Sequence, residues 1–434
     1  MVRLFYICIL AALIVSAPAA EGVTATTLPS GMKVIVREGH SVNLVAIDIW
    51  VRAGGVNETA ANCGVSHFIE HMIFKATEKY APGQIDREIE TLGADLNGGT
   101  MKDYVHFYTT VPSADLGTAL QVIADAVVHP KFRAEDMEKE RRIILDEIAR
   151  SEGDPMKHAL DLLAGVIFPT HPYGRPMAGT RETIARLTRD DLVSYYSAHF
   201  TPANTSVVIA GDVSRADAVA MVEKAFEGYD RKVAPPADAP ARDEAFSEPR
   251  TKRVPCAASQ AYVAVGFRVP GVADFSETCA LDALQIVFGD TANGRISTAL
   301  TTAGIPFTRI KTDYFTQREP TVFSVVAAID PDDADRVAPV IVDEFRKLAR
   351  SGVSDGELSY ARRLIEGSEL FEQETFAGQA RALGFWDVLE SYELSLKYAE
   401  TVRGITPEDI SNLARKHFTT EGYGVVILAP EVAE

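Results

Sequence analysis

The sequence predicts an α+β protein made of two homologous domains, each a mixed, mostly antiparallel sheet packed with helices. The main observation is an internal repeat. The stretch 45–51 matches 263–269 when 218 is added to each number, and both stretches have the apolar pattern of strands. Long helical patterns fill the middle of each copy, at 136–151 and 333–351. A second pair of segments aligns at the same separation and extends the repeat.

This second pair consists of short capped helices that lead into apolar strands. Thr188 and Thr406 are each followed, two and three residues later, by acidic residues, which is the pattern of a helix N-terminus. The strands that follow include 207–209 and 425–427, again 218 residues apart. A duplicated α+β unit is the simplest explanation.

The composition changes near Tyr229, where a stretch rich in Pro and Ala begins and the apolar period stops. We expect residues 229–258 to be a linker between an N-terminal domain, 21–228, and a C-terminal domain, 259–434. The length of 434 residues agrees with two domains, because a single core stops growing at about 250–300 residues.

The first twenty residues have the three parts of a secretory signal peptide. Arg3 precedes an apolar run, 4–15, and small residues fill 16–20. The run is short for a bilayer span, which needs about twenty residues, so an uncleaved anchor is the minority interpretation. We expect residues 1–20 to be removed, no stable membrane span to remain, and the protein to reach the periplasm of a bacterium.

The charge balance is acidic, with 61 Asp and Glu against 43 Lys and Arg and a formal net charge of -18. This argues against a nucleic-acid partner, which requires a basic surface. It is compatible with basic peptides as ligands, although solubility is the simpler explanation.

Cysteine usage argues against a disulfide framework. Beyond the expected signal peptide the chain has Cys63, Cys256 and Cys279, an odd number without paired spacing. One bridge between Cys256 and Cys279 stays open as a possibility.

His67 and His71 have the spacing of a metal-binding pair. Residues four apart on a helix leave the same face one turn from each other, so two imidazoles can hold one Zn²⁺. Glu70 shares that face and can reach a water on the metal as general base. The apolar neighbours of these residues favour a buried helix. The alternative is a pair of core histidines.

A catalytic zinc site needs a third protein ligand. The best candidates are Glu140 and Glu147, seven residues apart on one face of the predicted helix at 136–151. Ile143, Ile144 and Ile148 suggest that part of this helix is buried, where a carboxylate needs a cation or strong donors. Taken alone, the segment also fits a solvated acidic face.

The stretch 64–77, followed by Glu147 76 residues after His71, resembles the pitrilysin and insulinase zinc peptidases, nearest their processing-peptidase branch. The resemblance covers nearly the whole mature chain. It implies one zinc ion per chain, bound in the N-terminal domain by His67, His71 and Glu147. It also implies that Glu70 is the base and that Glu140 supports a ligand without touching the metal.

The resemblance further implies that Asn97 and Gly98 line the edge of the cleft, where an extended peptide substrate adds as a strand. The second copy lacks the motif. The positions 218 residues after His67, Glu70 and His71 are Gln285, Phe288 and Gly289, so we expect one catalytic centre per chain.

One part of the pattern is missing. Active relatives use an Arg and a Tyr from a late domain to stabilise the oxyanion, and at the corresponding stretch, 300–307, this chain has Thr301 and Phe307. The family works as two bowl-shaped halves closing around a chamber, and this chain is long enough for one half of the clamshell.

These departures lead to a specific expectation. We expect an endopeptidase for short or unfolded peptides that forms a heterodimer with a zinc-less homologue carrying the Arg and Tyr. A self-sufficient homodimer, with Tyr314 restoring a donor, is one alternative. A non-catalytic structural subunit is the other.

Overall fold

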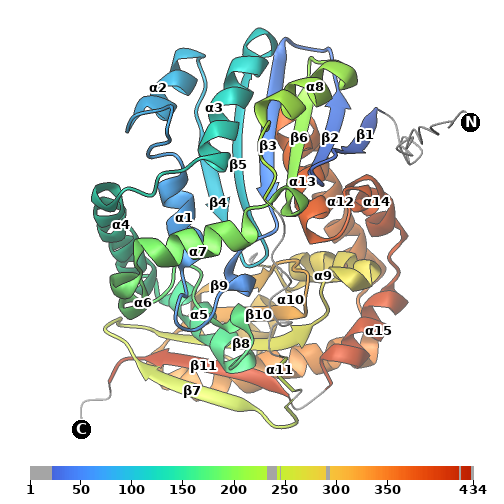
Figure 1. The fold of residues 1–434 in the computed structure, drawn as a ribbon. Coiled ribbons are helices and arrows are strands. Elements are labelled where there is room, and N and C mark those ends of the chain that lie inside the picture. The colour runs from blue at the N-terminus through green and yellow to red at the C-terminus, as the bar shows by residue number, and fades with distance from the viewer. Residues whose placement is uncertain (1–21, 232–241, 245, 290–293, 420–421, 432–434) are drawn as a thin grey trace, which may run out of the picture.

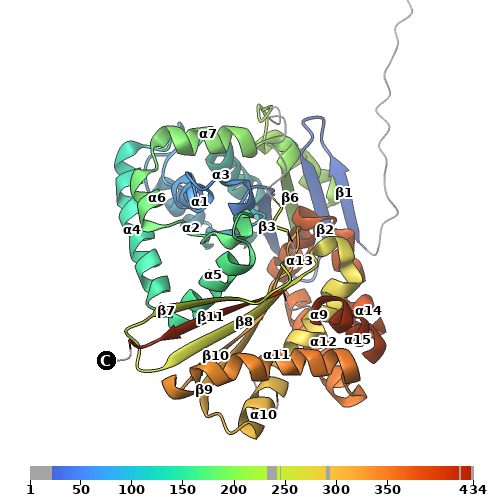
Figure 2. The same ribbon diagram turned by 90° about the horizontal axis from the view of Figure 1, so that it is seen from below.

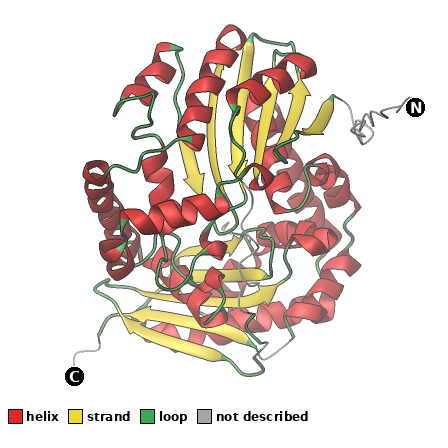
Figure 3. Ribbon diagram, in the orientation of Figure 1, coloured by secondary structure: helices red, strands yellow, loops and turns green. Residues whose placement is uncertain are grey.

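The computed structural model describes residues 22–231, 242–244, 246–289, 294–419 and 422–431. The expected signal peptide, 1–20, lies outside them. The described chain forms two sheets with helices packed on both, as Figures 1 and 3 show. None of its helices combines the length and the apolar character that crossing a membrane requires.

The first sheet has six strands in the order β1-β2-β6-β3-β5-β4. Only β2 and β6 pair in parallel, and the other pairs are antiparallel. The pairing leaves β4 as an edge strand beside β5. The strands are β1 Val23–Thr27, β2 Lys33–Glu38, β3 Leu44–Val51, β4 Asn97–Thr100, β5 Val105–Pro112 and β6 Thr205–Gly211.

The second sheet has five strands in the order β7-β11-β8-β10-β9, which corresponds to β2-β6-β3-β5-β4 of the first sheet. Its one parallel pair, β7 with β11, takes the place of β2 with β6. The prediction of two homologous domains is therefore confirmed at the level of strand order. The strands are β7 Arg250–Pro255, β8 Ala261–Val269, β9 Phe307–Tyr314, β10 Thr321–Ile329 and β11 Tyr423–Ala429.

The expected linker, 229–258, is wrong at its C-terminal end, because β7 lies inside it. Four of the first five residues of β7 are basic or polar and exposed, since the strand lies at the edge of its sheet and is paired on one side only. It therefore lacks the apolar pattern by which strands are predicted. The C-terminal domain begins by Arg250, and residues 232–241 of the expected linker lie outside the described chain.

The helices of the two halves also correspond. In both halves the predicted capped helix is present: Thr188 opens α7 and Thr406 opens α15, each in a capping box with an Asp three residues on. The first half has α1 Val65–Ile73, α2 Gln84–Thr91, α3 Leu116–Val128, α4 Ala134–Glu152, α5 Pro155–Ile167, α6 Arg181–Arg186, α7 Arg189–His199 and α8 Arg215–Ala225. The second half has α9 Phe275–Phe288, α10 Arg295–Thr302, α11 Ala334–Ser351, α12 Asp355–Gln373, α13 Phe376–Leu389, α14 Glu393–Gly404 and α15 Pro407–His417.

One helix of each half packs on the sheet of the other half. Helix α5 packs on β8, β10 and β11, and α13 packs on β3 and β6, an exchange visible in Figure 2. Gly384 of α13 allows close approach, because a Cβ there would overlap the Trp50 indole. The fully buried Asp387 accepts hydrogen bonds from Lys33 Nζ and Ser206 Oγ, both at 2.6 Å. The two halves are thus closely joined.

Candidate metal centre

Helix α1 carries the histidine pair, and a buried acid fixes its start. Gly64 precedes it at φ 92°, a conformation that favours glycine. The Glu58 carboxylate accepts hydrogen bonds from Gly64 N at 2.8 Å and Ser66 N at 2.9 Å. These bonds satisfy helix N-terminal donors and place negative charge at the positive end of the helix dipole. Glu58 is thus a positioning residue that the sequence did not reveal.

Helix α4 lies against α1 (Figure 1) and is tied in place by Arg141. The Arg141 guanidinium donates to the carbonyls of Ile184 and Leu187, and it lies 5.4 Å from the ring centroid of Phe68 in α1. Ile144 and Ile148 are buried as expected, but Ile143 is 42% exposed. Only one stripe of α4 faces the core, and Ile143 lies outside it.

The structure brings His67, His71 and Glu147 together. The two Nε2 atoms are 3.3 Å apart. Oε2 of Glu147 lies 3.7 Å from Nε2 of His67 and 3.5 Å from Nε2 of His71. One ligand atom from each residue therefore lies within 4.8 Å of the others, and no other such group of metal-binding side chains occurs in the described parts of the chain.

Glu140 lies behind His71 and does not belong to this triad. Its Oε2 is 3.1 Å from His71 Nδ1, and its Oε1 accepts from Lys75 Nζ at 2.8 Å. In the tautomer with its proton on Nδ1, His71 donates to the Glu140 carboxylate, and its Nε2 lone pair is then free to bind a cation. His67 has no such support, because its buried Nδ1 has no hydrogen-bond partner among the described residues.

The donor set fits a zinc ion. Burial and the neighbouring His71 lower the pKa of His67 to about 4, so its ring is neutral at pH 7. The two Nε2 atoms, 3.3 Å apart, cannot form a hydrogen bond with each other when neither carries a proton, but both lone pairs can then bind one cation. Two imidazoles and one carboxylate, with a further position open, are a frequent set of ligands for catalytic zinc.

Glu70 lies beside this triad at the open edge of the first sheet. Its Oε2 is 3.8 Å from His67 Nε2 and accepts a long hydrogen bond from Thr100 Oγ1 at 3.4 Å. Burial raises the pKa of Glu70. A Cβ on Gly98 would lie 3.2 Å from Glu70 Oε1, so the absence of a side chain there keeps the carboxylate accessible. Asn97, the first residue of β4, is exposed on the same edge strand.

A cavity of about 720 Å³ opens next to these groups. It is lined by His67, Glu70 and Glu147, by one face of α5, and by Lys252 of β7. The strand that sequence patterns did not predict therefore contributes to the wall of the site.

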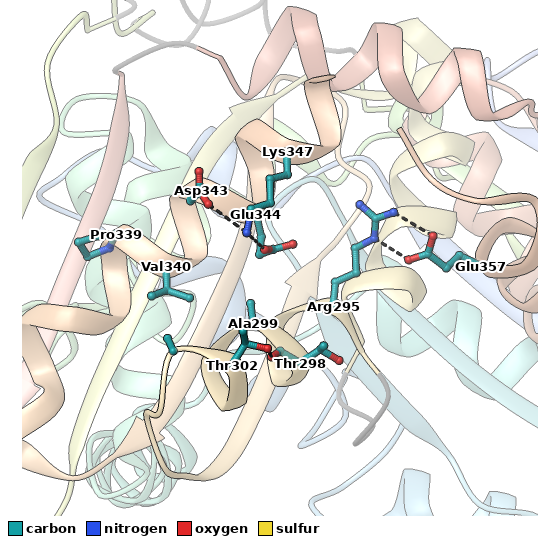
Figure 4. Close-up of a pocket in the computed structure, with 11 residues that line it drawn as sticks. Arg295, Thr298, Ala299, Thr302, Pro339, Val340, Asp343, Glu344, Lys347 and Glu357 are labelled. Atoms are coloured by element: carbon teal, nitrogen blue, oxygen red, sulfur yellow. Dashed lines mark hydrogen bonds and ion pairs between the residues drawn. The ribbon is translucent and has the colours of Figure 1, made fainter. Parts of the chain in front are cut away.

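No counterpart of the triad occurs among the described residues of the second half. Gln285 donates to the Thr312 carbonyl, and Phe288 and Gly289 are buried at the end of α9. Thr301 and Phe307 do not line the cavity at the triad. A separate hollow between α10 and α11 contains Arg295, which is paired with both carboxylate oxygens of Glu357 at 2.6 and 2.8 Å (Figure 4).

The three cysteines among the described residues form no bridge. Cys63, Cys256 and Cys279 are all free thiols, which excludes a Cys256–Cys279 bridge in this structure.

Comparison with known families agrees with the geometry. Residues 33–181 match the family described as Insulinase (Peptidase family M16), and residues 186–365 match that described as Peptidase M16 inactive domain. The chain belongs to the M16 peptidase family. The resemblance inferred from the stretch 64–77 is therefore confirmed.

Several M16 relatives are named as zinc proteases. An uncharacterized zinc protease of Mycobacterium tuberculosis is 28% identical over 409 residues, which cover 93% of this chain and 92% of that protein. One from Bacillus subtilis is 25% identical and covers 93% of this chain and 97% of its own length. A probable mitochondrial-processing peptidase subunit beta of Arabidopsis thaliana is 28% identical, covering 93% of this chain and 76% of that one.

Solved structures share the M16 fold. A protease from Helicobacter pylori superposes with a TM-score of 0.87 at 20% identity, over 94% of this chain and 99% of that one. A peptidase M16 inactive domain from Pseudomonas fluorescens gives 0.84 at 20% identity, over 95% and 98%.

Proposed function

We propose that this M16 chain is a zinc-dependent endopeptidase for short or unfolded peptides, acting in a closed chamber as the zinc-bearing subunit of a heterodimer. One observation carries the proposal. His67, His71 and Glu147 converge within 4.8 Å, with Glu70 beside them at the open edge of β4.

Each residue of the site has a separate role in the proposed peptide hydrolysis. His67, His71 and Glu147 would hold a zinc ion, which when bound would supply Lewis-acid chemistry to a water molecule and to the substrate carbonyl. Glu70, whose pKa is raised, accepts the proton of the attacking water and then passes it to the departing amine. Glu140 orients His71. The edge of β4, with Asn97 and Gly98, pairs with the peptide backbone and holds the scissile bond over Glu70.

The substitution Glu70→Gln tests the enzyme assignment. It keeps the shape and removes the base, so the variant should retain about one zinc per chain while cleavage of a quenched fluorescent peptide falls by about 10²–10⁴-fold. Asp146→Asn, an exposed acid next to Glu147, is the matched control and should cleave as the wild type does. Unchanged cleavage by Glu70→Gln would refute the mechanism.

The proposed heterodimer follows from the missing donors. Thr301 and Phe307 cannot stabilise an oxyanion in place of Arg and Tyr, and the loss of one such donor typically costs about 10²–10³-fold in rate. We therefore expect the purified chain to be a poor enzyme alone and to gain activity with a zinc-less homologue that has both residues. Full activity of the lone chain would instead support the homodimer.

A non-catalytic structural subunit is the second candidate. The presence of Thr301 and Phe307 in place of the Arg and Tyr favours it. It predicts bound zinc without cleavage, either alone or with the homologue. For the location we propose the bacterial periplasm, after removal of residues 1–20. Osmotic-shock fractionation and N-terminal sequencing of the natural protein test both points.

A further inference from the structure

The outer face of α12 carries an exposed apolar stripe. Tyr360, Leu364 and Phe371 lie four and seven residues apart, so they follow one side of the helix, and their exposed fractions are 44%, 43% and 73%. Leu370, next to the stripe, is 70% exposed. The helix packs on its own molecule through a different face, formed by Leu358, Ala361 and Ile365. Single exposed apolar residues are common, but a continuous stripe is typical of a surface that binds a partner.

Gly367 lies in the middle of this stripe, between Leu364 and Phe371. Glycine inside a helix is unfavourable compared with alanine. The chain's own packing does not require it, because no atom of the described chain lies within 4 Å of a Cβ built at Gly367. Ser368, the next residue, is small and exposed. The two residues therefore leave a flat site at which the backbone of another helix can approach closely.

The stripe has opposite charges toward its two ends. Arg363 and Glu374 are exposed, and neither takes part in an ion pair within the described residues. Arg363 donates to Ser359 Oγ at 3.1 Å. Glu374 directly follows α12 and keeps helical backbone angles, φ -66° and ψ -27°. A basic and an acidic end on one helix face complement each other when two copies of the helix lie antiparallel.

The spacing of these residues fits an antiparallel pair of α12 helices with a two-fold axis between Gly367 and Ser368. A helix rises about 1.5 Å per residue, so Leu364 and Phe371 lie about 5 Å on either side of this axis. Leu364 of each copy is then level with Phe371 of the other. Arg363 is about 7 Å from the axis and Glu374 about 10 Å, so Arg363 can reach Glu374 of the other copy.

We propose that α12 binds α12 of a second copy of this chain, antiparallel, with Gly367 at the crossing point. The same residues contribute on both sides, as a symmetric dimer requires. In Figures 1 and 2, α12 lies on the opposite side of the molecule from α1 and α4, and no residue of the stripe lines the cavity at the proposed zinc site. The inference therefore goes beyond the proposed peptidase and its heterodimer. A single helix pair is a small interface, so the association is weak.

Sedimentation equilibrium of the full mature chain, zinc-loaded, tests this proposal at about 1–100 µM, the range in which a small interface associates. The average mass should rise with concentration from that of one chain toward that of two. Phe371→Ser should weaken the association about tenfold or more, because it removes an apolar side chain from each side of the contact. Phe371 is exposed in the single chain, so the melting temperature at low concentration and the zinc content should not change. The mass of one chain at every concentration would overturn the proposal.

Gly367→Gln should have opposite effects on the chain and on its association. The new side chain meets open space in the single chain, and glutamine is the better helix former, so the melting temperature at low concentration should rise. In the dimer the side chain would obstruct the crossing point, so the association should weaken about tenfold or more. Association of this variant at the wild-type concentration would refute the crossing at Gly367.

Charge reversal identifies the occupant. Arg363→Glu and Glu374→Arg each place like charges opposite one another in a symmetric dimer, so each variant alone should be mostly monomeric. An equimolar mixture of the two variants should associate again, because every contact between them then joins opposite charges. Arg87→Glu, which reverses an exposed charge on α2, is the control and should associate as the wild type does. A mixture that stays monomeric would contradict the antiparallel pair.

The same measurements separate other occupants of α12. Association only with a zinc-less homologue, lost in Phe371→Ser, would assign this face to the heterodimer and overturn the second copy as its occupant. Failure of the wild-type chain to bind zinc or to cleave any peptide would refute the proposed function. It would leave this inference intact, because the association requires neither.

Discussion

Glu140 Oε2 lies 3.1 Å from His71 Nδ1, while Nδ1 of the neighbouring His67 has no partner among the described residues. The two proposed zinc ligands on α1 are therefore not equivalent. His71 is held in one tautomer by a carboxylate that is itself fixed by Lys75. His67 relies on packing alone.

This asymmetry makes Glu140→Gln informative. The amide keeps an acceptor near His71 but loses the charge that supports the ring and pairs with Lys75, so zinc affinity should fall about 10–100-fold. Competition with a chromophoric chelator measures this. Asp146→Asn on the exposed face of α4 is the control, and an unchanged affinity in Glu140→Gln would show that Glu140 does not support His71.

Arg141→Ala should loosen α4. The change leaves the carbonyls of Ile184 and Leu187 without a donor and removes the stacking on Phe68, which together should cost about 1–3 kcal/mol of unfolding free energy. Glu147 is on the same helix, so zinc affinity should fall as well. Urea unfolding of this variant beside Arg142→Ala, its exposed neighbour, checks the claim. Similar stability of the two variants would contradict it.

Asp282→Asn should change how stability depends on pH. The folded pKa of Asp282, about 7, is above the usual value of 3.8, so the native state holds a proton that the unfolded state releases between these values. The acid therefore lowers stability progressively as pH rises from about 4 to 7. Relative to the wild type, the variant should gain on the order of 2–4 kcal/mol at pH 8 and little at pH 4. A gain that is equal at both pH values would show that charge is not the cause.

Gly384→Ala should be strongly destabilising, because its new methyl group would overlap the Trp50 indole at the junction of the two halves. Overpacking of this kind costs about 1–3 kcal/mol or more. Gly367→Ala is a suitable control, because nothing lies within 4 Å of its added Cβ and alanine is the better helix former. Thermal unfolding should therefore separate the two variants, and equal melting temperatures would argue against close packing here.

The sequence was sufficient for features that depend on local spacing. His67, Glu70 and His71 fall on one helix face because the period of the helix requires it. The repeat predicted two homologous domains because the strand residues of both copies are still alike at 45–51 and 263–269. The prediction that α4 contacts α1 depended on the family resemblance. No local sequence pattern places Glu147 next to His71, 76 positions earlier.

Other features depend on contacts between distant segments. Strand β7 was missed because an exposed edge strand needs no apolar face. A cavity of about 340 Å³ between the halves, lined by Trp50 and Trp386, could not be predicted, because these residues come from distant parts of the chain and meet only where α13 packs on the first sheet. Glu58 resembles any surface acid until the burial of its carboxylate is known.

The exchange of α5 and α13 determines when the protein can finish folding. One face of the first sheet lacks its covering helix until residues 376–389 have been synthesised, and the second sheet, which α5 covers, is complete only when β11, at 423–429, is in place. An N-terminal fragment released early would expose the apolar surface of β3 and β6 to solvent. We therefore expect assembly to be completed only after nearly the whole chain has left the ribosome, and a fragment that stops before α13 to aggregate rather than persist as an independent domain.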